Sequence, residues 1–266
     1  MSTHIHPTAI IDPTTKLGME VRVGPYAIID EGCVIGDHCE VRAHAVICKG
    51  TIIGPHNQIG YGAVIGAEPQ DYGFKGGYSR VEIGSGNKIR EYVTIHRASK
   101  EAGATTVGND NFLMGGVHLG HDVQVGNHVI LANNTLLSGY VQVGDRAFLG
   151  GATVVHQFVR IGSYAITRGG TRLGKDVPPY YMAVDTNQVS GINRVGLRRA
   201  GLSHETRRSI QAAYELIYRS DLNVGQALAE LRGKFHQPEI AHLIEFIAQS
   251  KRGICSDYRR GEAEEE

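Results

Sequence analysis

The amino-acid sequence predicts a mainly β protein, a parallel β-helix of hexapeptide repeats followed by an α-helical C-terminal domain. Three observations support this fold class. Aliphatic residues recur at every sixth position from Ile5 to Ile65 and, with two interruptions, continue to Ile161. Glycine accounts for 35 of the 266 residues, well above the usual ~7%, and shows no collagen-like period. Beyond Pro179 the six-residue period gives way to helical spacing.

The six-residue period accounts for the first part of the chain. It fits neither an α-helix nor an alternating strand and is typical of a β-helix. Three hexads, about 18 residues, make one triangular coil, in which aliphatic residues face inward and glycines and polar residues turn the corners. Neighbouring coils stack at about 4.8 Å. Thr167 replaces one aliphatic residue and Leu173 ends the series, so we place the β-helix domain at residues 1–186.

Two segments of this domain, 67–80 and 97–104, lack inward aliphatic residues. Each is predicted to leave the prism as a loop. Loops on a rigid scaffold are favoured places for binding and catalytic residues.

The C-terminal domain, residues 187–266, is predicted to contain three helices that cover the open end of the last coil. Ser203 is expected to cap the first helix. Apolar residues at helical spacing define the three segments: Ile210, Ala213, Leu216 and Ile217; then Leu228 and Leu231; then, after Pro238, Ile240, Leu243, Ile244 and Ile247. The acidic end of the chain, residues 261–266, is expected to be disordered.

The composition excludes several classes of protein. The 27 basic and 27 acidic residues balance, which argues against a nucleic-acid or membrane-surface binder. No apolar run approaches the ~18 residues of a membrane span, and the N-terminus does not resemble a signal peptide. The four cysteines form no metal-ligand motif and are interpreted as reduced residues of a cytoplasmic protein: Cys33, Cys39, Cys48 and Cys255.

The densest polar cluster is His118-Leu-Gly-His121-Asp122. His121 occupies a corner position, and Gly139 lies 18 residues later, one coil along the prism. Acyl transfer needs such a pair. The imidazole takes the proton from an acceptor hydroxyl, the amide of Gly139 stabilises the oxyanion, and the absent side chain leaves room for the substrate. Asp122 is placed to orient His121.

Motifs along the whole chain resemble the UDP-N-acetylglucosamine acyltransferases of lipid A biosynthesis, a family of hexapeptide-repeat enzymes. They include Pro69-Gln70-Asp71, Ile89–Arg97, His118–Asp122, Val155–Phe158, Asp176–Pro179 and Tyr214–Ser220. The resemblance implies a left-handed β-helix and a homotrimer with sites between subunits. It also implies transfer of a 3-hydroxyacyl chain from acyl carrier protein to the 3-hydroxyl of a UDP-sugar, without a metal or redox cofactor, because the thioester supplies the activated acyl group.

The resemblance also implies roles for individual residues. His121 would be the general base, Asp122 its orienting partner and Gly139 the oxyanion donor, and Gly169 would set the length of the acyl chain. The remaining expected substrate-binding residues are Gln70, Asp71, His96, His118, His156, Gln157, Asn193 and Arg199. A cluster of arginines in 194–208 is expected to attract the acidic carrier protein.

Four positions depart from the family pattern: Gly73 replaces a lysine, for which Lys75 is a substitute, Tyr140 a histidine, Val195 a glutamate and Ala200 an arginine. N-acylation of a 3-amino nucleotide sugar therefore stays open as an alternative. Two further alternatives are a trimeric zinc carbonic anhydrase and a non-catalytic homologue of the same envelope pathway. A bound-metal assay and a His121→Ala variant distinguish them.

Overall fold

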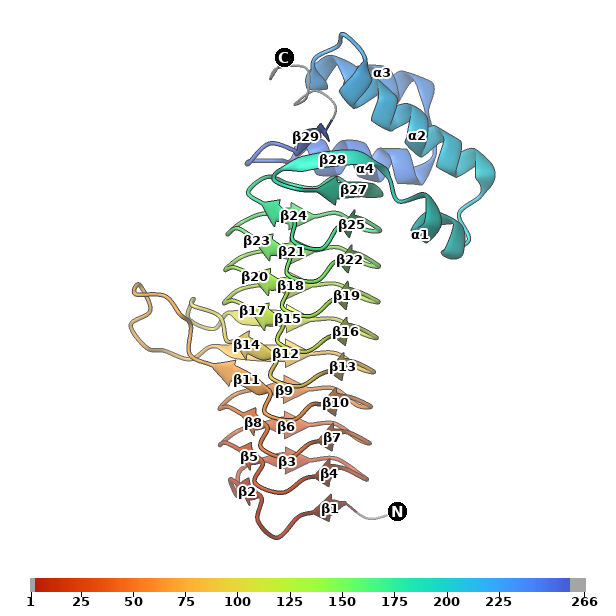
Figure 1. Cartoon of the computed structure of the whole chain (residues 1–266). Helices are drawn as coiled ribbons and strands as arrows, with labels where there is room; N and C mark the ends of the chain where they lie inside the picture. The colour runs from red at the N-terminus through yellow and green to blue at the C-terminus, as the bar shows by residue number, and fades with distance from the viewer. Residues whose placement is uncertain (1–2, 259–266) are drawn as a thin grey trace.

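The computed structural model describes residues 3–258 and confirms the predicted prism (Figure 1). Short strands from successive coils pair in parallel and form three flat sheets, here named A, B and C. The chain runs from sheet A to B to C and back to A, so the prism has an AB, a BC and a CA edge. The predicted acidic tail lies outside the described residues.

Sheet A has twelve strands: β1 (His4–Ile5), β4 (Arg22–Val23), β7 (Glu40–Val41), β10 (Gln58–Ile59), β13 (Lys88–Ile89), β16 (Phe112–Leu113), β19 (Ile130–Leu131), β22 (Phe148–Leu149), β25 (Ile166–Thr167), β27 (Tyr181–Val184), β28 (Gln188–Ile192) and β29 (Ser256–Asp257). Sheet B has nine: β2 (Ile10–Ile11), β5 (Ile28–Ile29), β8 (Val46–Ile47), β11 (Val64–Ala67), β14 (Thr94–His96), β17 (His118–Leu119), β20 (Leu136–Leu137), β23 (Val154–Val155) and β26 (Arg172–Leu173). Sheet C has eight: β3 (Lys16–Leu17), β6 (Val34–Ile35), β9 (Ile52–Ile53), β12 (Arg80–Ile83), β15 (Ala104–Val107), β18 (Gln124–Val125), β21 (Gln142–Val143) and β24 (Arg160–Ile161).

The hydrophobic period builds the core of the prism. Leu119 pairs with Leu137, and Leu137 pairs with Val155, one coil further along sheet B. All three side chains are fully buried, because each inward residue is covered by its equivalents in the neighbouring coils. In sheet A, Thr167 follows Leu149 in the equivalent stack and leaves no unpaired polar atom, since its hydroxyl lies 2.8 Å from that of the buried Thr153.

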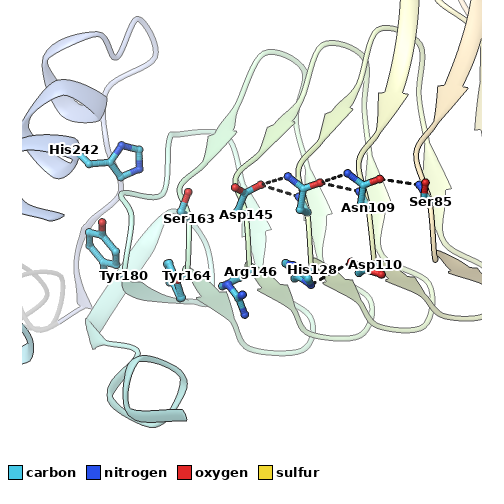
Figure 2. A pocket seen from close by; sticks show the side chains of 11 residues that line it. Ser85, Asn109, Asp110, His128, Asp145, Arg146, Ser163, Tyr164, Tyr180 and His242 are labelled. Carbon is cyan, nitrogen blue, oxygen red and sulfur yellow. Dashed lines mark hydrogen bonds and ion pairs between the residues drawn. The ribbon is translucent and has the colours of Figure 1, made fainter. Parts of the chain in front are cut away.

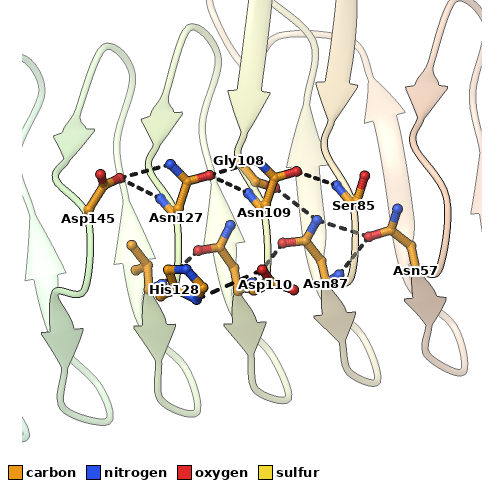
Figure 3. A network of polar contacts seen from close by, with 11 residues as sticks. Asn57, Ser85, Asn87, Gly108, Asn109, Asp110, Asn127, His128 and Asp145 are labelled. Carbon is orange, nitrogen blue, oxygen red and sulfur yellow. Dashed lines mark hydrogen bonds and ion pairs between the residues drawn. The ribbon is translucent and has the colours of Figure 1, made fainter. Parts of the chain in front are cut away.

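Polar ladders hold the coils together along the CA edge (Figure 3). On the surface, the backbone amide of Asn127 donates to Asp145 Oδ1, and that of Asn109 donates to Asn127 Oδ1. A parallel ladder of buried asparagines lies beside it, in which the amide of Asn87 donates to Asn57 Oδ1 at 2.8 Å. Each side chain thus satisfies a corner amide of an adjacent coil.

Both insertions leave the same edge of the prism. The first joins β11 to β12 and the second joins β14 to β15, so each replaces a BC corner, and Figure 1 shows them projecting side by side. The amide of Ala102 in the second loop donates to the carbonyl of Tyr78 in the first, at 2.7 Å. The first loop lies between Ala67 and Arg80 and the second between His96 and Ala104.

The C-terminal region contains four helices: α1 (Arg194–Arg199), α2 (His204–Arg219), α3 (Val224–Lys234) and α4 (Pro238–Ala248). Helices α2, α3 and α4 are the three predicted ones, and Ser203 caps α2 by accepting from the amide of Thr206. The apolar residues predicted for their inner faces are buried, with Leu216 partly exposed. Within residues 3–258, no helix combines the length and apolarity needed to cross a membrane.

Helix α1 and the antiparallel hairpin β27–β28 were not predicted. Neither segment has the hexapeptide period, and α1, with 6 residues, is too short to show a helical period. The domain boundary placed after residue 186 falls inside this hairpin, and sheet A continues across it to β28 and β29.

A buried ion pair joins the helices to the last coil. Asp176 is fully buried and accepts from the backbone amide, Nε and Nη2 of Arg160. Its carboxylate also accepts from Ser250 Oγ, and Arg160 donates to the carbonyl of Phe246 on α4. This contact fixes the helical region on the end of the prism.

Candidate functional site

The BC edge brings together most of the residues that the sequence singled out. His121, Gly139 and Gln157 occupy the same corner position in three successive coils, because β17, β20 and β23 lie in register in sheet B. His96 ends β14 and His118 begins β17 in the same sheet. Both insertions leave this edge in the two preceding coils, and the second reaches Asp122 through Ser99.

His121 and Asp122 form a hydrogen-bonded pair. Consecutive strand residues face opposite ways, but Asp122 has a φ of 60°, and this left-handed corner turns its carboxylate back toward the imidazole. His121 Nδ1 donates to Asp122 Oδ2 at 2.8 Å. The bond places the proton of the neutral ring on Nδ1 and leaves Nε2 with a free lone pair.

The imidazole of His121 lies against the backbone of Gly139. A methyl group built on Gly139 would lie 2.6 Å from His121 Nε2, so this space is taken by the imidazole itself. The glycine is therefore needed for a different reason from the predicted one, which was access of the substrate. No acceptor among the described residues takes a hydrogen bond from the Gly139 amide, which therefore remains available beside Nε2.

The second insertion closes over this pair. Asp122 Oδ2 accepts from both the backbone amide and the hydroxyl of Ser99, at 2.9 and 2.8 Å. Ser99 Oγ lies 2.9 Å from the phenol oxygen of Tyr140, whose ring meets that of His121 edge to face. As a result the side chain of His121, expected to point outward, is only 9% exposed. The sequence analysis missed Ser99, since nothing in its local sequence shows how the loop folds back.

His96 and His118 extend the site along sheet B. Their rings meet edge to face with centroids 5.2 Å apart. His96 Nδ1 donates to the carbonyl of Glu68 in the first insertion, and His118 Nδ1 lies 2.8 Å from Thr94 Oγ1. Burial and the nearby His96 lower the pKa of His118 to about 4, so His118 is neutral near pH 7 and serves as a hydrogen-bonding group.

The other predicted binding residues on this edge are solvent-exposed. Gln70 and Asp71 lie in the first insertion, and His156 and Gln157 follow β23. Asp71 Oδ1 accepts from the amide of Gly73 at 2.7 Å and shapes its own loop. All four side chains are exposed on this edge or on its first insertion and can meet a ligand.

Three predicted residues lie elsewhere. Gly169 follows β25 on the AB edge and is exposed. Asn193 caps α1 and donates to the carbonyl of Tyr164 on the CA edge, and Arg199 is exposed at the end of α1. One chain does not bring these residues to His121.

The four departures from the family pattern also have definite places. Gly73 lies in the first insertion, where Lys75 donates to the carbonyl of Tyr72. Tyr140 belongs to the network around Asp122. Val195 on α1 and Ala200 at its end are exposed. None of the four disturbs the contact between His121 and Asp122.

Two of the hollows that adjoin the prism bear on the location of the site. One, about 830 Å³, runs from Asp122 and Tyr140 to Lys251 and Arg252 of the C-terminal region. The other, about 740 Å³, lies on the CA edge (Figure 2). Its asparagine ladder is engaged within the fold, and its one pairing of a histidine with a carboxylate is a loose, exposed contact, with His128 Nδ1 3.9 Å from Asp110 Oδ2. The first hollow reaches Asp122 and Tyr140 and is the one connected to the candidate site. Across residues 3–258, no group of three His, Cys, Asp or Glu is arranged to hold a metal ion.

Comparison with known proteins identifies the fold and the family. A model of bacterial transferase hexapeptide repeats matches residues 14–49, 32–67 and 104–139. A model described as UDP-N-acetylglucosamine O-acyltransferase, domain 2, matches residues 176–255. These matches correspond to the prism and to the C-terminal region.

Relatives that match nearly the whole chain are named for the same activity. A protein named acyl-[acyl-carrier-protein]–UDP-N-acetylglucosamine O-acyltransferase from Sulfurihydrogenibium sp. is 55% identical, over 95% of this chain and 94% of its own. One of the same name from Thermodesulfovibrio yellowstonii is 45% identical over 94% and 98%. The crystal structure of a UDP-N-acetylglucosamine acyltransferase from Bacteroides fragilis superimposes with a TM-score of 0.90 at 44% identity, covering 94% of this chain and 99% of that one. The prism is accordingly a left-handed parallel β-helix.

Proposed function

Because this chain belongs to the family of UDP-N-acetylglucosamine O-acyltransferases, we propose that it moves a 3-hydroxyacyl chain from acyl carrier protein to the 3-hydroxyl of UDP-N-acetylglucosamine. This is the first step of lipid A biosynthesis. One structural observation supports this chemistry most directly: the hydrogen-bonded pair of His121 and Asp122 lies beside the free amide of Gly139.

In the proposed mechanism His121 acts as general base. Asp122 accepts a hydrogen bond from Nδ1–H, which keeps the lone pair of the ring on Nε2. Nε2 takes the proton from the sugar hydroxyl as the hydroxyl oxygen attacks the thioester carbonyl. The amide of Gly139 donates to the oxyanion of the tetrahedral intermediate. The intermediate then collapses, the carbon–sulfur bond breaks, and the thiolate of the carrier takes the proton back from Nε2. The thioester supplies the activated acyl group, so the reaction needs no metal or redox cofactor.

We propose a homotrimer as the working unit. Gly169 and Arg199, expected at the acyl chain and the nucleotide, lie on parts of the chain remote from the BC edge that holds His121. The edges of a prism face away from each other. A substrate that meets all of them therefore needs the edges of neighbouring copies.

The binding partners follow from the same arrangement. We place the sugar nucleotide against His96, His118, Gln70, Asp71 and the nucleotide-binding residues of a neighbouring copy, and the carrier arm near His156 and Gln157. The exposed arginines of α1 are suited to an acidic carrier protein. We also propose that the protein acts in the cytoplasm, because its four cysteines are free thiols, as is usual in a reducing compartment.

Product mass tests this proposal. The protein is incubated with 3-hydroxyacyl carrier proteins of several lengths and either UDP-N-acetylglucosamine or its 3-amino analogue. An O-acylated product from the ordinary sugar is expected. Product from the amino analogue alone would instead assign N-acylation, and product from neither would leave a non-catalytic homologue.

A further inference from the structure

Around Asp122, three hydrogen bonds converge on a single carboxylate oxygen. Oδ2 accepts from His121 Nδ1 at 2.8 Å, from the backbone amide of Ser99 at 2.9 Å and from Ser99 Oγ at 2.8 Å. The backbone amide of Asp122 donates to Thr105 Oγ1 at 2.8 Å. Both the carboxylate and its backbone are thereby held, and the carboxylate in turn holds His121.

The directions of these hydrogen bonds follow from the chemistry of the groups. A carboxylate only accepts, so the single hydroxyl proton of Ser99 points at Asp122. Ser99 Oγ then has only lone pairs to offer to the phenol of Tyr140, 2.9 Å away. The phenol is therefore the donor. The chain of donors runs from Tyr140 to Ser99 to Asp122, and Asp122 accepts the Nδ1 proton of His121.

The ring of Tyr140 is held on several sides. It stacks on Phe158 with centroids 4.7 Å apart and meets His121 edge to face at 5.2 Å. The ammonium group of Lys100 lies 5.3 Å from its centroid. Tyr140 has a φ of 62°, like Asp122 one coil below, so the same corner geometry directs both side chains toward the second insertion.

We propose that Ser99 and Tyr140 are positioning residues of the acyl-transfer site. They hold the carboxylate of Asp122 so that His121 presents Nε2 beside Gly139, and the second insertion thereby becomes part of the catalytic apparatus. Tyr140 supplies the phenol of this arrangement, and Ser99 supplies the hydroxyl that links it to Asp122. The inference rests on the proposed role of His121 as general base.

Ser99→Ala is the first test, because it removes the hydroxyl and keeps the backbone bond that anchors the loop. A hydrogen bond to a charged group contributes about 1.5–3 kcal/mol, so we expect kcat to fall by roughly 10-fold or more with KM unchanged. Ser99→Thr keeps the hydroxyl and is expected to retain kcat within about 3-fold. A merely structural role would lower the melting temperature or raise KM and would not depend on the hydroxyl.

Tyr140→Phe is the second test. It keeps the stacked ring and removes the phenol, which donates to a neutral acceptor, so kcat is expected to fall by about 3- to 10-fold. Tyr26→Phe is a matched control, since Tyr26 has a φ of 57° and stacks on His44 in a distant coil. Its kcat should remain that of the wild type.

A double-mutant cycle shows whether Ser99 acts through Asp122. In an Asp122→Ala background the shared acceptor is gone, so adding Ser99→Ala should lower kcat by less than about 2-fold. A full additional loss would overturn the inference, as would wild-type kcat in Ser99→Ala. Activity remaining in His121→Ala would instead overturn the proposed base, so failure of the two ideas is distinguishable.

Discussion

The imidazole of His121 occupies the space that a side chain at Gly139 would need. A methyl group on Gly139 would lie 2.5 Å from His121 Cε1 and 2.6 Å from Nε2, well inside van der Waals contact. The proposed base and the proposed oxyanion donor lie one coil apart and are thus linked by a packing constraint.

Gly139→Ala is therefore expected to displace the ring of His121 and lower kcat by about 100-fold, a loss like that of an oxyanion donor. The cost in stability should remain within about 1–3 kcal/mol, the range for overpacking. Turnover and thermal unfolding of the variant measure the two effects. Gly151→Ala is the control, since its new methyl group would meet only the carbonyl oxygen of Asn133 at 3.3 Å. Equal turnover of both variants would contradict this account.

Gly169→Met tests the residue proposed to limit the acyl chain. The Cβ of a side chain at this exposed position would meet only backbone atoms of Gly151, the nearest at 3.2 Å, which leaves the rest of the side chain room to extend outward from the AB edge. We expect the ratio of turnover with long and short acyl chains to fall by about 10-fold or more. Competition between carrier proteins of different acyl length measures this ratio, and an unchanged ratio would remove Gly169 from the acyl site.

The lowered pKa of His118 predicts that part of the free energy of unfolding is lost at acidic pH. Burial, with a contribution from His96, lowers its pKa to about 4, whereas an unfolded histidine titrates near 6.5. Between these values the unfolded chain binds a proton that the folded chain does not, so stability falls as pH drops through this window. His118→Gln should flatten the decline in melting temperature from pH 7 to pH 4.5. His236→Gln, at an exposed histidine, should keep the wild-type slope, and an equal slope in all three proteins would be inconsistent with a buried neutral His118.

Asp176→Ala tests the connection between prism and helices. It would leave the guanidinium of Arg160, whose side chain is 19% exposed, without its carboxylate, a loss that costs about 3–5 kcal/mol for buried pairs. Denaturant unfolding should show this loss. The exposed pair of Lys49 and Glu31 offers the comparison, since Glu31→Ala should change stability by at most about 1 kcal/mol. Similar effects of the two substitutions would argue against a structural role for Asp176.

The sequence predicts the prism well because the six-residue period of aliphatic residues directly reflects which side chains are buried in the core. Every sixth residue is buried by the equivalent residues of the neighbouring coils, so the spacing of 18 residues alone predicts the contact between Leu119 and Leu137. The helices after Ser203 follow from capping and apolar spacing for the same local reason. Helix α1 and the β27–β28 hairpin are held by neighbours distant in sequence, such as Tyr164 against Asn193, and carry no comparable pattern.

The site was predictable in part. The coil length of about 18 residues places Gly139 beside His121, and the corner explains how Asp122 turns back. The approach of Ser99 to Asp122 depends on how an irregular loop folds over the edge, which no period describes. The low exposure of His121 and the hydrogen bond of Tyr140 escape sequence reasoning for the same reason.

The central claim is that His121 is the base of an O-acyl transfer. The most direct test is the mass of the product from UDP-N-acetylglucosamine and 3-hydroxyacyl carrier protein, with wild-type protein and with His121→Ala of the same melting temperature. The account predicts an O-acylated sugar nucleotide with the wild type and a loss of at least about 1,000-fold in turnover with the variant. Comparable turnover by both proteins would contradict it.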